Sequence, residues 1–354
     1  MKNSEKYMQR CLQLAKNALG NCYPNPMVGS VIVYNGKIIG EGWHQKAGEG
    51  HAEVNAIASV KDKNLLTKST LYVNLEPCSH FGKTPPCSDL IIQHKIIKVV
   101  IGIIDSHSKV CGAGILKLQN AGVEVEVGVL ESECYELNKR FFTFHNKERP
   151  YIILKWAESR DGFIAPDKSQ REKIEPVWIS NPISRQLVHK WRTEEQAILI
   201  GTNTALDDNP SLNARDWKGK SPVKILIDRQ GIVPPNAAIF NSASAKTILI
   251  TQNLDIASAE GIIIETVTPG DLLPQLLAIL RKHNILSVIV EGGKHTLQTF
   301  VDADLWDEAR VFEGQIDLST GISAPNISGK LKYTENILTD KLSVMLNSNQ
   351  SWKK

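Results

Sequence analysis

The chain has 354 residues, more than the roughly 100 to 200 of a typical domain, so we expect two domains. Hydrophobic residues make up 42% and charged residues 22%, which excludes a disordered or a fibrous protein. The net charge is only +3, and the 41 basic side chains form no block of the kind that follows a phosphate backbone. We therefore expect no nucleic acid as a partner, whereas a single phosphate on a small substrate is compatible with this charge.

Export signals and membrane spans are not expected. Charged residues interrupt the apolar positions of the first 20 residues, unlike the continuous apolar core of a signal peptide. The sequence contains no run of about 18 apolar residues that could cross a membrane. Six cysteines without an export signal indicate reduced thiols or metal ligands. Together these features predict a soluble, cytoplasmic protein with no membrane partner.

The first half alternates helical and strand patterns. Residues 4–18 place apolar side chains at helical spacing behind Ser4 as an N-cap, and the two apolar runs that flank Asn35-Gly36 predict a β-hairpin. We expect further helices at 51–59, 88–94 and 112–121, and strands at 70–75, 98–103 and 123–127. This alternation indicates an α/β layer structure.

The second half begins after a charged turn that ends at Pro150. We place the boundary near residue 146, so that residues 1–146 and 147–354 form the two domains. Strands are expected at 151–155, 197–200, 223–227, 247–251, 262–265 and 287–290, with a crossover helix at 272–283. This order predicts a mostly parallel sheet that is covered by helices.

A candidate metal site lies in the first half, where His51-Ala52-Glu53 is followed by Cys78 and Cys87. One imidazole and two thiolates are three protein ligands, and a fourth tetrahedral position left to water is typical of catalytic zinc. Zinc lowers the pKa of such a water toward neutrality. Glu53 lies two residues after a ligand and can carry a proton from the water to a leaving amine. The pattern predicts hydrolytic deamination of an amino heterocycle.

A closed structural zinc site is the main alternative. It needs a fourth ligand, which His80 could supply, but Glu53 would then have no chemical purpose. The other cysteines have no motif partner and are expected to be packed or surface residues: Cys11, Cys22, Cys111 and Cys134.

The spacing of the two cysteines points to one deaminase family. The general deaminase signature has two residues between its cysteines, whereas eight separate Cys78 from Cys87. The segments HAEVNA and LEPCSHFGKTPPC resemble the deaminase domain of the RibD family, the bifunctional riboflavin biosynthesis deaminase/reductases. The resemblance implies a cytidine-deaminase-like α/β/α domain, in which His51, Cys78 and Cys87 bind zinc and Glu53 is the proton carrier. It also implies that Asn25, in Asn25-Pro26-Met27, lies on the substrate side of this site.

The second half carries a weaker pattern by itself. Gly201 and Thr202 follow an expected strand, and Gly292-Gly293 follows another and precedes a helix near Thr296, where backbone N–H groups could meet a phosphate. Such glycine pairs are more often ordinary turns, and no GxGxxG is present.

The segments KWAESRDG, GTNTALDDNPSLNAR and VEGG resemble the reductase domain of the same family, which implies a dihydrofolate-reductase-like α/β fold and NADPH as cofactor. The family's cofactor positions correspond to Ala157, Trp178, Thr204, Asp208, Gly293, Lys294, His295, Thr296, Leu297, Gln298 and Thr299. Its substrate positions correspond to Arg192, Leu212, Arg215 and Glu291, and Lys155 lies where the family keeps a lysine near the reacting sugar. The two arginines suit a ribose phosphate. The chain departs from the family pattern at Pro176, Arg229 and Lys294.

The leading hypothesis is a bifunctional enzyme of riboflavin biosynthesis. Zinc-dependent deamination of 2,5-diamino-6-ribosylamino-4(3H)-pyrimidinone 5′-phosphate would be followed by NADPH-dependent reduction of the ribosyl group to ribityl, because this two-electron step needs a hydride donor. One rival is a deaminase of a free base, a nucleotide or tRNA whose second half only binds. Another is a zinc-stabilised binding module without turnover. We further expect a homo-oligomer, either a dimer or a tetramer.

Overall fold

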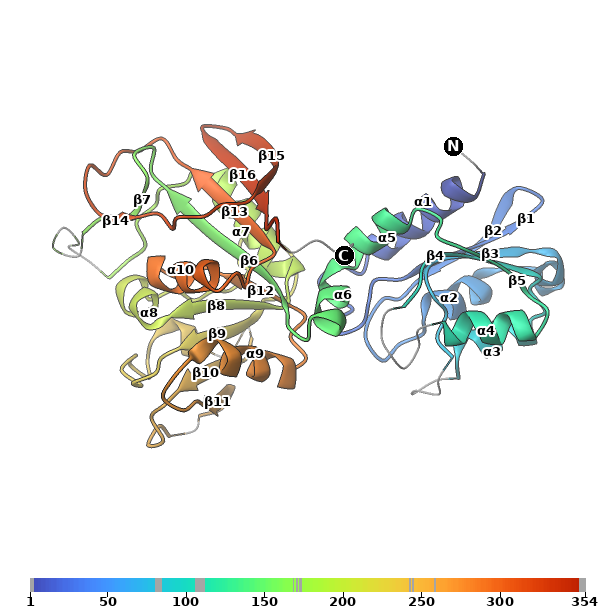
Figure 1. The fold of residues 1–354 in the computed structure, drawn as a ribbon, viewed down its shortest axis with the longest axis horizontal. Helices are drawn as coiled ribbons and strands as arrows, with labels where there is room; N and C mark the ends of the chain where they lie inside the picture. The colour runs from blue at the N-terminus through green and yellow to red at the C-terminus, as the bar shows by residue number, and fades with distance from the viewer. Residues whose placement is uncertain are drawn as a thin grey trace. The chain divides into compact units, whose positions relative to one another are not determined.

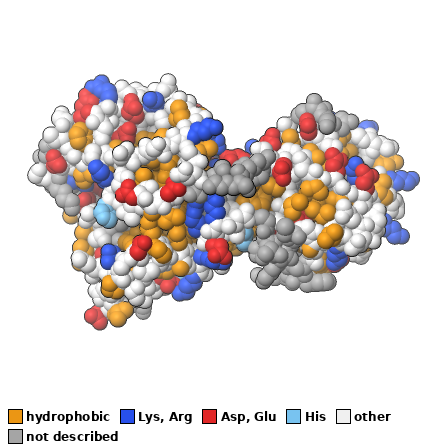
Figure 2. Space-filling model, viewed as in Figure 1, with side chains coloured by type: hydrophobic (Ala, Val, Ile, Leu, Met, Phe, Trp, Pro, Cys, Tyr) orange, Lys and Arg blue, Asp and Glu red, His pale blue; other side chains and the backbone are white. Residues whose placement is uncertain are grey.

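The computed structural model describes residues 3–79, 85–105, 112–167, 169, 171, 174–241, 243, 245–257 and 259–349. The chain divides into two compact units, Met1–Glu148 and Arg149–Lys354 (Figure 1). Acidic and basic side chains both occur on the visible face of each unit, as the small net charge indicates (Figure 2). Among the described residues, no helix combines the length and the hydropathy that a bilayer span requires.

The described part of the first unit contains a five-stranded sheet in the order β2-β1-β3-β4-β5. Its strands are β1 (Gly29–Tyr34), β2 (Lys37–Trp43), β3 (Thr70–Leu75), β4 (Lys98–Ile103) and β5 (Glu124–Val127). The predicted hairpin is confirmed: β1 and β2 are antiparallel, and Asn35 and Gly36 both have positive φ, as a two-residue hairpin turn requires. The pairs β3/β4 and β4/β5 are parallel because helices connect these strands.

Helices cover both faces of this sheet (Figure 1). On one face lie α2 (Ala52–Ser59), α3 (Cys87–Gln93) and α4 (Ala113–Asn120), whose side chains Ile57, Ile91 and Leu118 pack with buried residues of β3 and β4. On the other face lie α1 (Asn3–Lys16) and α5 (Glu131–Leu137), followed by α6 (Lys139–Asn146). The expected three-layer arrangement is therefore confirmed, although the sequence interpretation did not predict α5 and α6.

The second unit has a nine-stranded sheet within its described residues, in the order β11-β10-β9-β8-β12-β6-β13-β16-β15. The strands are β6 (Tyr151–Glu158), β8 (Ala197–Gly201), β9 (Val223–Ile227), β10 (Thr247–Thr251), β11 (Ile262–Thr266), β12 (Ser287–Val290), β13 (Glu308–Glu313), β15 (Lys330–Ile337) and β16 (Asp340–Leu346). The predicted parallel pairing is confirmed from β11 to β6. The strand β13, which was not predicted, continues the parallel part, and β16 and β15 add an antiparallel edge that was not predicted either. A separate pair joins β7 (Phe163–Ala165) and β14 (Ile322–Ser323).

The parallel strands of this sheet are buried on both faces. Ala197 and Leu199 of β8 enter the core that contains α9 (Leu272–Lys282) and α10 (Lys294–Asp302), whereas Ile198 and Ile200 point the other way. On that second face lie α7 (Pro182–Glu194) and α8 (Thr202–Asp208). Burial on both faces explains why these strands are continuous apolar runs in the sequence.

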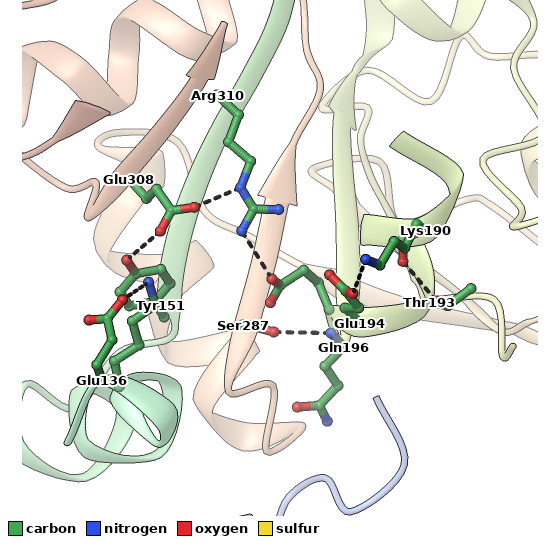
Figure 3. A network of polar contacts seen from close by, with 11 residues as sticks. Glu136, Tyr151, Lys190, Thr193, Glu194, Gln196, Ser287, Glu308 and Arg310 are labelled. Carbon is green, nitrogen blue, oxygen red and sulfur yellow. Dashed lines mark hydrogen bonds and ion pairs between the residues drawn. The ribbon is translucent and has the colours of Figure 1, made fainter. Parts of the chain in front are cut away.

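A buried ionic network lies beside β13, the strand at which the parallel and antiparallel parts of the sheet meet. Arg310 donates to Glu308, at 2.6 Å, and lies 3.5 Å from a carboxylate oxygen of Glu195. Tyr151 donates to the other oxygen of Glu308 (Figure 3). Arg310 also stacks on the Trp191 ring. Such groups are retained in an interior only when they are paired.

Candidate active sites

The three expected metal ligands come from the ends of different elements and meet in the first unit. His51 is the N-cap residue of α2, Cys78 follows β3, and Cys87 is the first residue of α3. His51 Nδ1 lies 3.3 Å from Cys87 Sγ and 3.6 Å from Cys78 Sγ, and the three ligand atoms all lie within 4.8 Å of one another. A tetrahedral zinc with its usual bond lengths holds ligand atoms about 3.5 to 3.8 Å apart, so this set fits zinc.

The chemistry of the ligands agrees with that fit. Hydrogen bonds from Cys87 and His51 lower the pKa of the Cys78 thiol to about 4. The shared hydrogen bond raises the pKa of Cys87, because the two thiols share one proton. Since metals bind thiolates, the site already favours ionisation of one ligand. His80, the fourth ligand of the alternative closed site, lies outside the described residues, as does Cys111, whereas Cys11, Cys22 and Cys134 are buried.

Glu53 lies in the first turn of α2, two residues after His51, and its side chain is buried. Burial, followed by the negative charge of Cys78, raises the pKa of Glu53 to about 7. A carboxyl group whose pKa is close to neutrality can both accept and release a proton. The arrangement can therefore move protons beside the metal ligands.

Asn25 lies beside the same site through a histidine that the sequence interpretation had left without a role. The Asn25 Nδ2 atom is 3.0 Å from His44 Nε2, and the buried His44 ring packs edge-on against His51. Two buried asparagines, Asn74 and Asn138, hydrogen-bond the backbone of Met27 and hold this loop. The position of His44 directly after a strand was the available sequence signal.

Glu76 is a second residue that sequence reasoning missed. Its buried carboxylate accepts backbone N–H groups of Asp105, Gly112, Gly114 and Ile115, at 2.9 to 3.3 Å. The bonds from Gly112, Gly114 and Ile115 satisfy N–H groups at the start of α4, which have no partner within the helix. Glu76 thereby fixes the chain two residues before Cys78 to the start of α4.

The second unit contains a cleft of roughly 1740 Å³ at the carboxyl ends of the parallel strands. All but one of the residues expected to form the reductase site line it: Lys155, Ala157, Trp178, Arg192, Thr204, Asp208, Leu212, Arg215, Glu291, Gly293, Lys294, His295, Thr296, Gln298 and Thr299. The exception is Leu297, which the structure places in the hydrophobic core because it lies on the inner face of α10. Pro176, Arg229 and Lys294, where the chain departs from the family pattern, also line the cleft.

A buried charge cluster forms one wall of the cleft. Arg192 Nη2 donates to Glu291 Oε2 at 2.8 Å, and Lys155 Nζ lies 3.9 Å from the same oxygen. Burial opposes ionisation of Glu291, but Arg192 and Lys155 outweigh it and hold the pKa of this carboxyl at about 2. Burial also lowers the pKa of Lys155. Glu291 is therefore ionised and fixes two cations beside the cleft.

The start of α10 forms another part of the wall. Gly293 is its N-cap residue, and the Gly293 N–H donates to Thr204 Oγ1 at 2.9 Å. A side chain at Gly292 would collide with Thr296, so the chain needs glycine at that position. Backbone N–H groups at a helix N-terminus favour anionic groups such as phosphate.

Comparison with known proteins gives a family for each unit. Residues 1–103 match the family model described as the cytidine and deoxycytidylate deaminase zinc-binding region, and residues 150–314 match that of the RibD C-terminal domain. The riboflavin biosynthesis protein RibD of Aquifex aeolicus is 40% identical, over 90% of this chain and 89% of that protein. The chain belongs to the RibD family. Its relative in Synechocystis sp. is 35% identical, over 95% of this chain and 90% of that protein.

Solved structures of the RibD family have the same fold over nearly the whole chain. The crystal structure of a diaminohydroxyphosphoribosylaminopyrimidine deaminase/5-amino-6-(5-phosphoribosylamino)uracil reductase from Thermotoga maritima is 35% identical with a TM-score of 0.88, covering 98% of this chain and 99% of that chain. Acinetobacter baumannii RibD gives a TM-score of 0.87 at 30% identity, covering 98% and 99%. The protein is thus a bifunctional enzyme of riboflavin biosynthesis with a cytidine-deaminase-like unit and a reductase unit, as predicted.

Proposed function

We propose that the first unit deaminates 2,5-diamino-6-ribosylamino-4(3H)-pyrimidinone 5′-phosphate, and that the second reduces the ribosyl group of the product to ribityl with NADPH. The observation that carries this proposal is that one chain contains two different sites. One is a three-ligand set beside buried Glu53, and the other is a large cleft with a fixed charge cluster. The similar protein from Thermotoga maritima is described as a deaminase/reductase acting on such phosphorylated pyrimidines.

In the deaminase unit, His51, Cys78 and Cys87 would hold zinc, which supplies Lewis acidity toward water. Glu53 takes a proton from the attacking water and delivers it to the leaving amine, since its burial keeps its pKa near neutrality. Asn25, fixed by His44, offers its carboxamide to the pyrimidine. Ammonia leaves, and the amino-substituted ring carbon becomes a carbonyl.

In the reductase unit, the residues that line the cleft would bind NADPH, which supplies the hydride. The N-terminus of α10, with Thr204 beside it, suits a phosphate of the cofactor. Arg192 and Arg215 suit the substrate's phosphate ester, because guanidinium groups bind phosphate through paired hydrogen bonds. Lys155, held by Glu291, is placed to act near the sugar.

The decisive experiment is to supply the purified protein with the diamino pyrimidine phosphate, with and without NADPH. We expect ammonia in both cases and NADPH oxidation only after ammonia release. Supplying the deaminated intermediate directly should give NADPH oxidation without ammonia. The reductase proposal fails if no NADPH is oxidised with that intermediate, and the deaminase proposal fails if the diamino compound releases no ammonia.

A further inference from the structure

A buried histidine on the wall of the reductase cleft has no role in the function proposed above. His189 lies on α7, one turn before Arg192, and only 5% of its side chain is exposed. It lines the same cleft as Arg192 and Arg215. Within the described residues, Nδ1 of His189 is buried without a hydrogen-bond partner.

The other ring nitrogen contacts an acidic residue at the cleft rim. His189 Nε2 lies 3.0 Å from Asp216 Oδ2. A proton on Nδ1 would be buried without an acceptor, so the neutral ring carries its proton on Nε2, which faces the Asp216 carboxylate. Burial, followed by the charge of Arg192, lowers the pKa of His189, which agrees with a neutral ring. The charged groups that act on His189 are Arg192, Asp216, Arg215 and Glu291.

Asp216 adjoins the guanidinium that we assign to the substrate's phosphate ester. The same oxygen, Asp216 Oδ2, is 3.7 Å from Arg215 Nε, too far for a hydrogen bond. About half of each of these two side chains is exposed, so both can move. A carboxylate free to move beside an arginine closes into a paired, bidentate contact, which occupies the donors that a phosphate needs.

The backbone around Asp216 is already docked on α7 without His189. Arg192 Nη1 donates to the carbonyl oxygen of Asn213, and Lys190 lies over the Trp217 ring at 5.7 Å. The segment that carries Arg215 and Asp216 therefore has contacts on both sides of this pair. The contact between His189 and Asp216 accordingly sets the direction of one carboxylate and is not needed to hold the segment.

We propose that His189 is a positioning residue of the reductase's substrate site, which holds the Asp216 carboxylate away from Arg215 and keeps that guanidinium available for the phosphate ester. The inference rests on the proposed reductase function, because it takes the phosphate ester as the ligand of Arg215. This positioning role differs from a purely structural one in one respect. The weaker phosphate binding expected when His189 is lost is caused by Asp216, so removing Asp216 as well should restore the binding.

The test uses the full chain and four variants: H189A, H189Q, D216A and the double variant H189A/D216A. Two quantities are measured, the KM for the deaminated intermediate during NADPH oxidation and the Kd of ribose 5-phosphate by calorimetry without NADPH. H189A should raise both about three- to fivefold, the size expected when a half-exposed ion pair forms, with a smaller change in kcat. H189Q should stay close to wild type because the glutamine amide can replace Nε2–H. D216A and the double variant should bind no more weakly than wild type.

His283 provides a matched control, since it also pairs with a carboxylate, Glu265, but does not line the cleft. H283A should change neither quantity. The inference is overturned if H189A binds ribose 5-phosphate as wild type does, or if the double variant remains as weak as H189A. If wild type oxidises no NADPH, the proposed reductase function fails, while the binding of ribose 5-phosphate still decides the role of His189.

Discussion

The two sites of this chain are built in opposite ways. The metal site of the first unit needs three ligand side chains and one carboxylate. The ends of β3, α2 and α3 bring the three ligand atoms within 4.8 Å of one another. The reductase cleft instead takes residues from across the second unit, from Lys155 on β6 to Ile322 on β14. A metal concentrates the chemistry at one point, whereas an extended cofactor requires a long surface. The two activities should therefore respond to different perturbations.

Metal removal should give the largest difference between the two activities. Treatment with a chelator is expected to abolish ammonia release, because the ligand set has lost its metal. NADPH oxidation with the deaminated intermediate should continue at the wild-type rate, since the cleft contains none of these ligands. Ammonia and cofactor absorbance are measured before and after zinc is restored. Loss of both activities would show that the units are not independent.

Glu53→Gln should give the next largest effect. Removing the proton carrier is expected to slow deamination by about 10²- to 10⁴-fold, while zinc content and NADPH oxidation stay unchanged. The measurements are single-turnover ammonia release and metal analysis. Glu49→Gln, at an exposed position two residues before His51, is the control and should keep full activity. Intact turnover in E53Q would favour a zinc-stabilised module with no role for Glu53.

A buried ion pair allows the second unit to be destabilised by itself. Arg149 makes two hydrogen bonds to Asp307, at 2.6 and 2.8 Å, and Asp307 also accepts the Ile152 N–H. Asp307→Asn removes the negative charge that pairs with the buried Arg149 guanidinium, so the free energy of unfolding should fall by about 3 kcal/mol. The measurement is urea unfolding followed through NADPH oxidation and ammonia release. D317N, in an exposed pair with Arg160, should leave the midpoint unchanged.

The charge cluster of the cleft predicts a smaller, pH-dependent effect. The pKa of Glu291 is lowered to about 2 in the fold, from an ordinary value of 4.5. The ionised carboxylate therefore stabilises the folded state at neutral pH, and this contribution is lost as the pH falls from about 5 toward 2. The difference in the free energy of unfolding between wild type and E291Q should become smaller by about 1 kcal/mol when the pH is lowered from about 7 to about 4. Unfolding at both pH values measures this difference, and a difference that increases would contradict the assignment.

Much of the fold could be predicted because local sequence patterns indicate many of its turns, strands and helices. The Asn35-Gly36 turn, the apolar strand at 98–103 and the helix at 272–283 all occur where the sequence indicates them. The antiparallel edge was missed because β15 is almost entirely exposed, and the short alternation Lys330-Leu331-Lys332-Tyr333 ends in the polar run Thr334-Glu335-Asn336. The helix α7 was also missed, although Asn181 caps it and Pro182 occupies its first turn, a recognised start signal.

The sequence alone predicted the chemistry of the first site, because metal ligands and a proton carrier are recognised by residue type and spacing, and by family resemblance. Through that resemblance it also predicted residues that the structure finds lining the cleft. Only the tertiary structure showed that Glu76 accepts four backbone N–H groups, that His44 fixes Asn25, and that Leu297 belongs to the core. These contacts join residues that are distant in the chain. Which residues become partners depends on the order of the strands in each sheet, and a local sequence pattern does not determine that order.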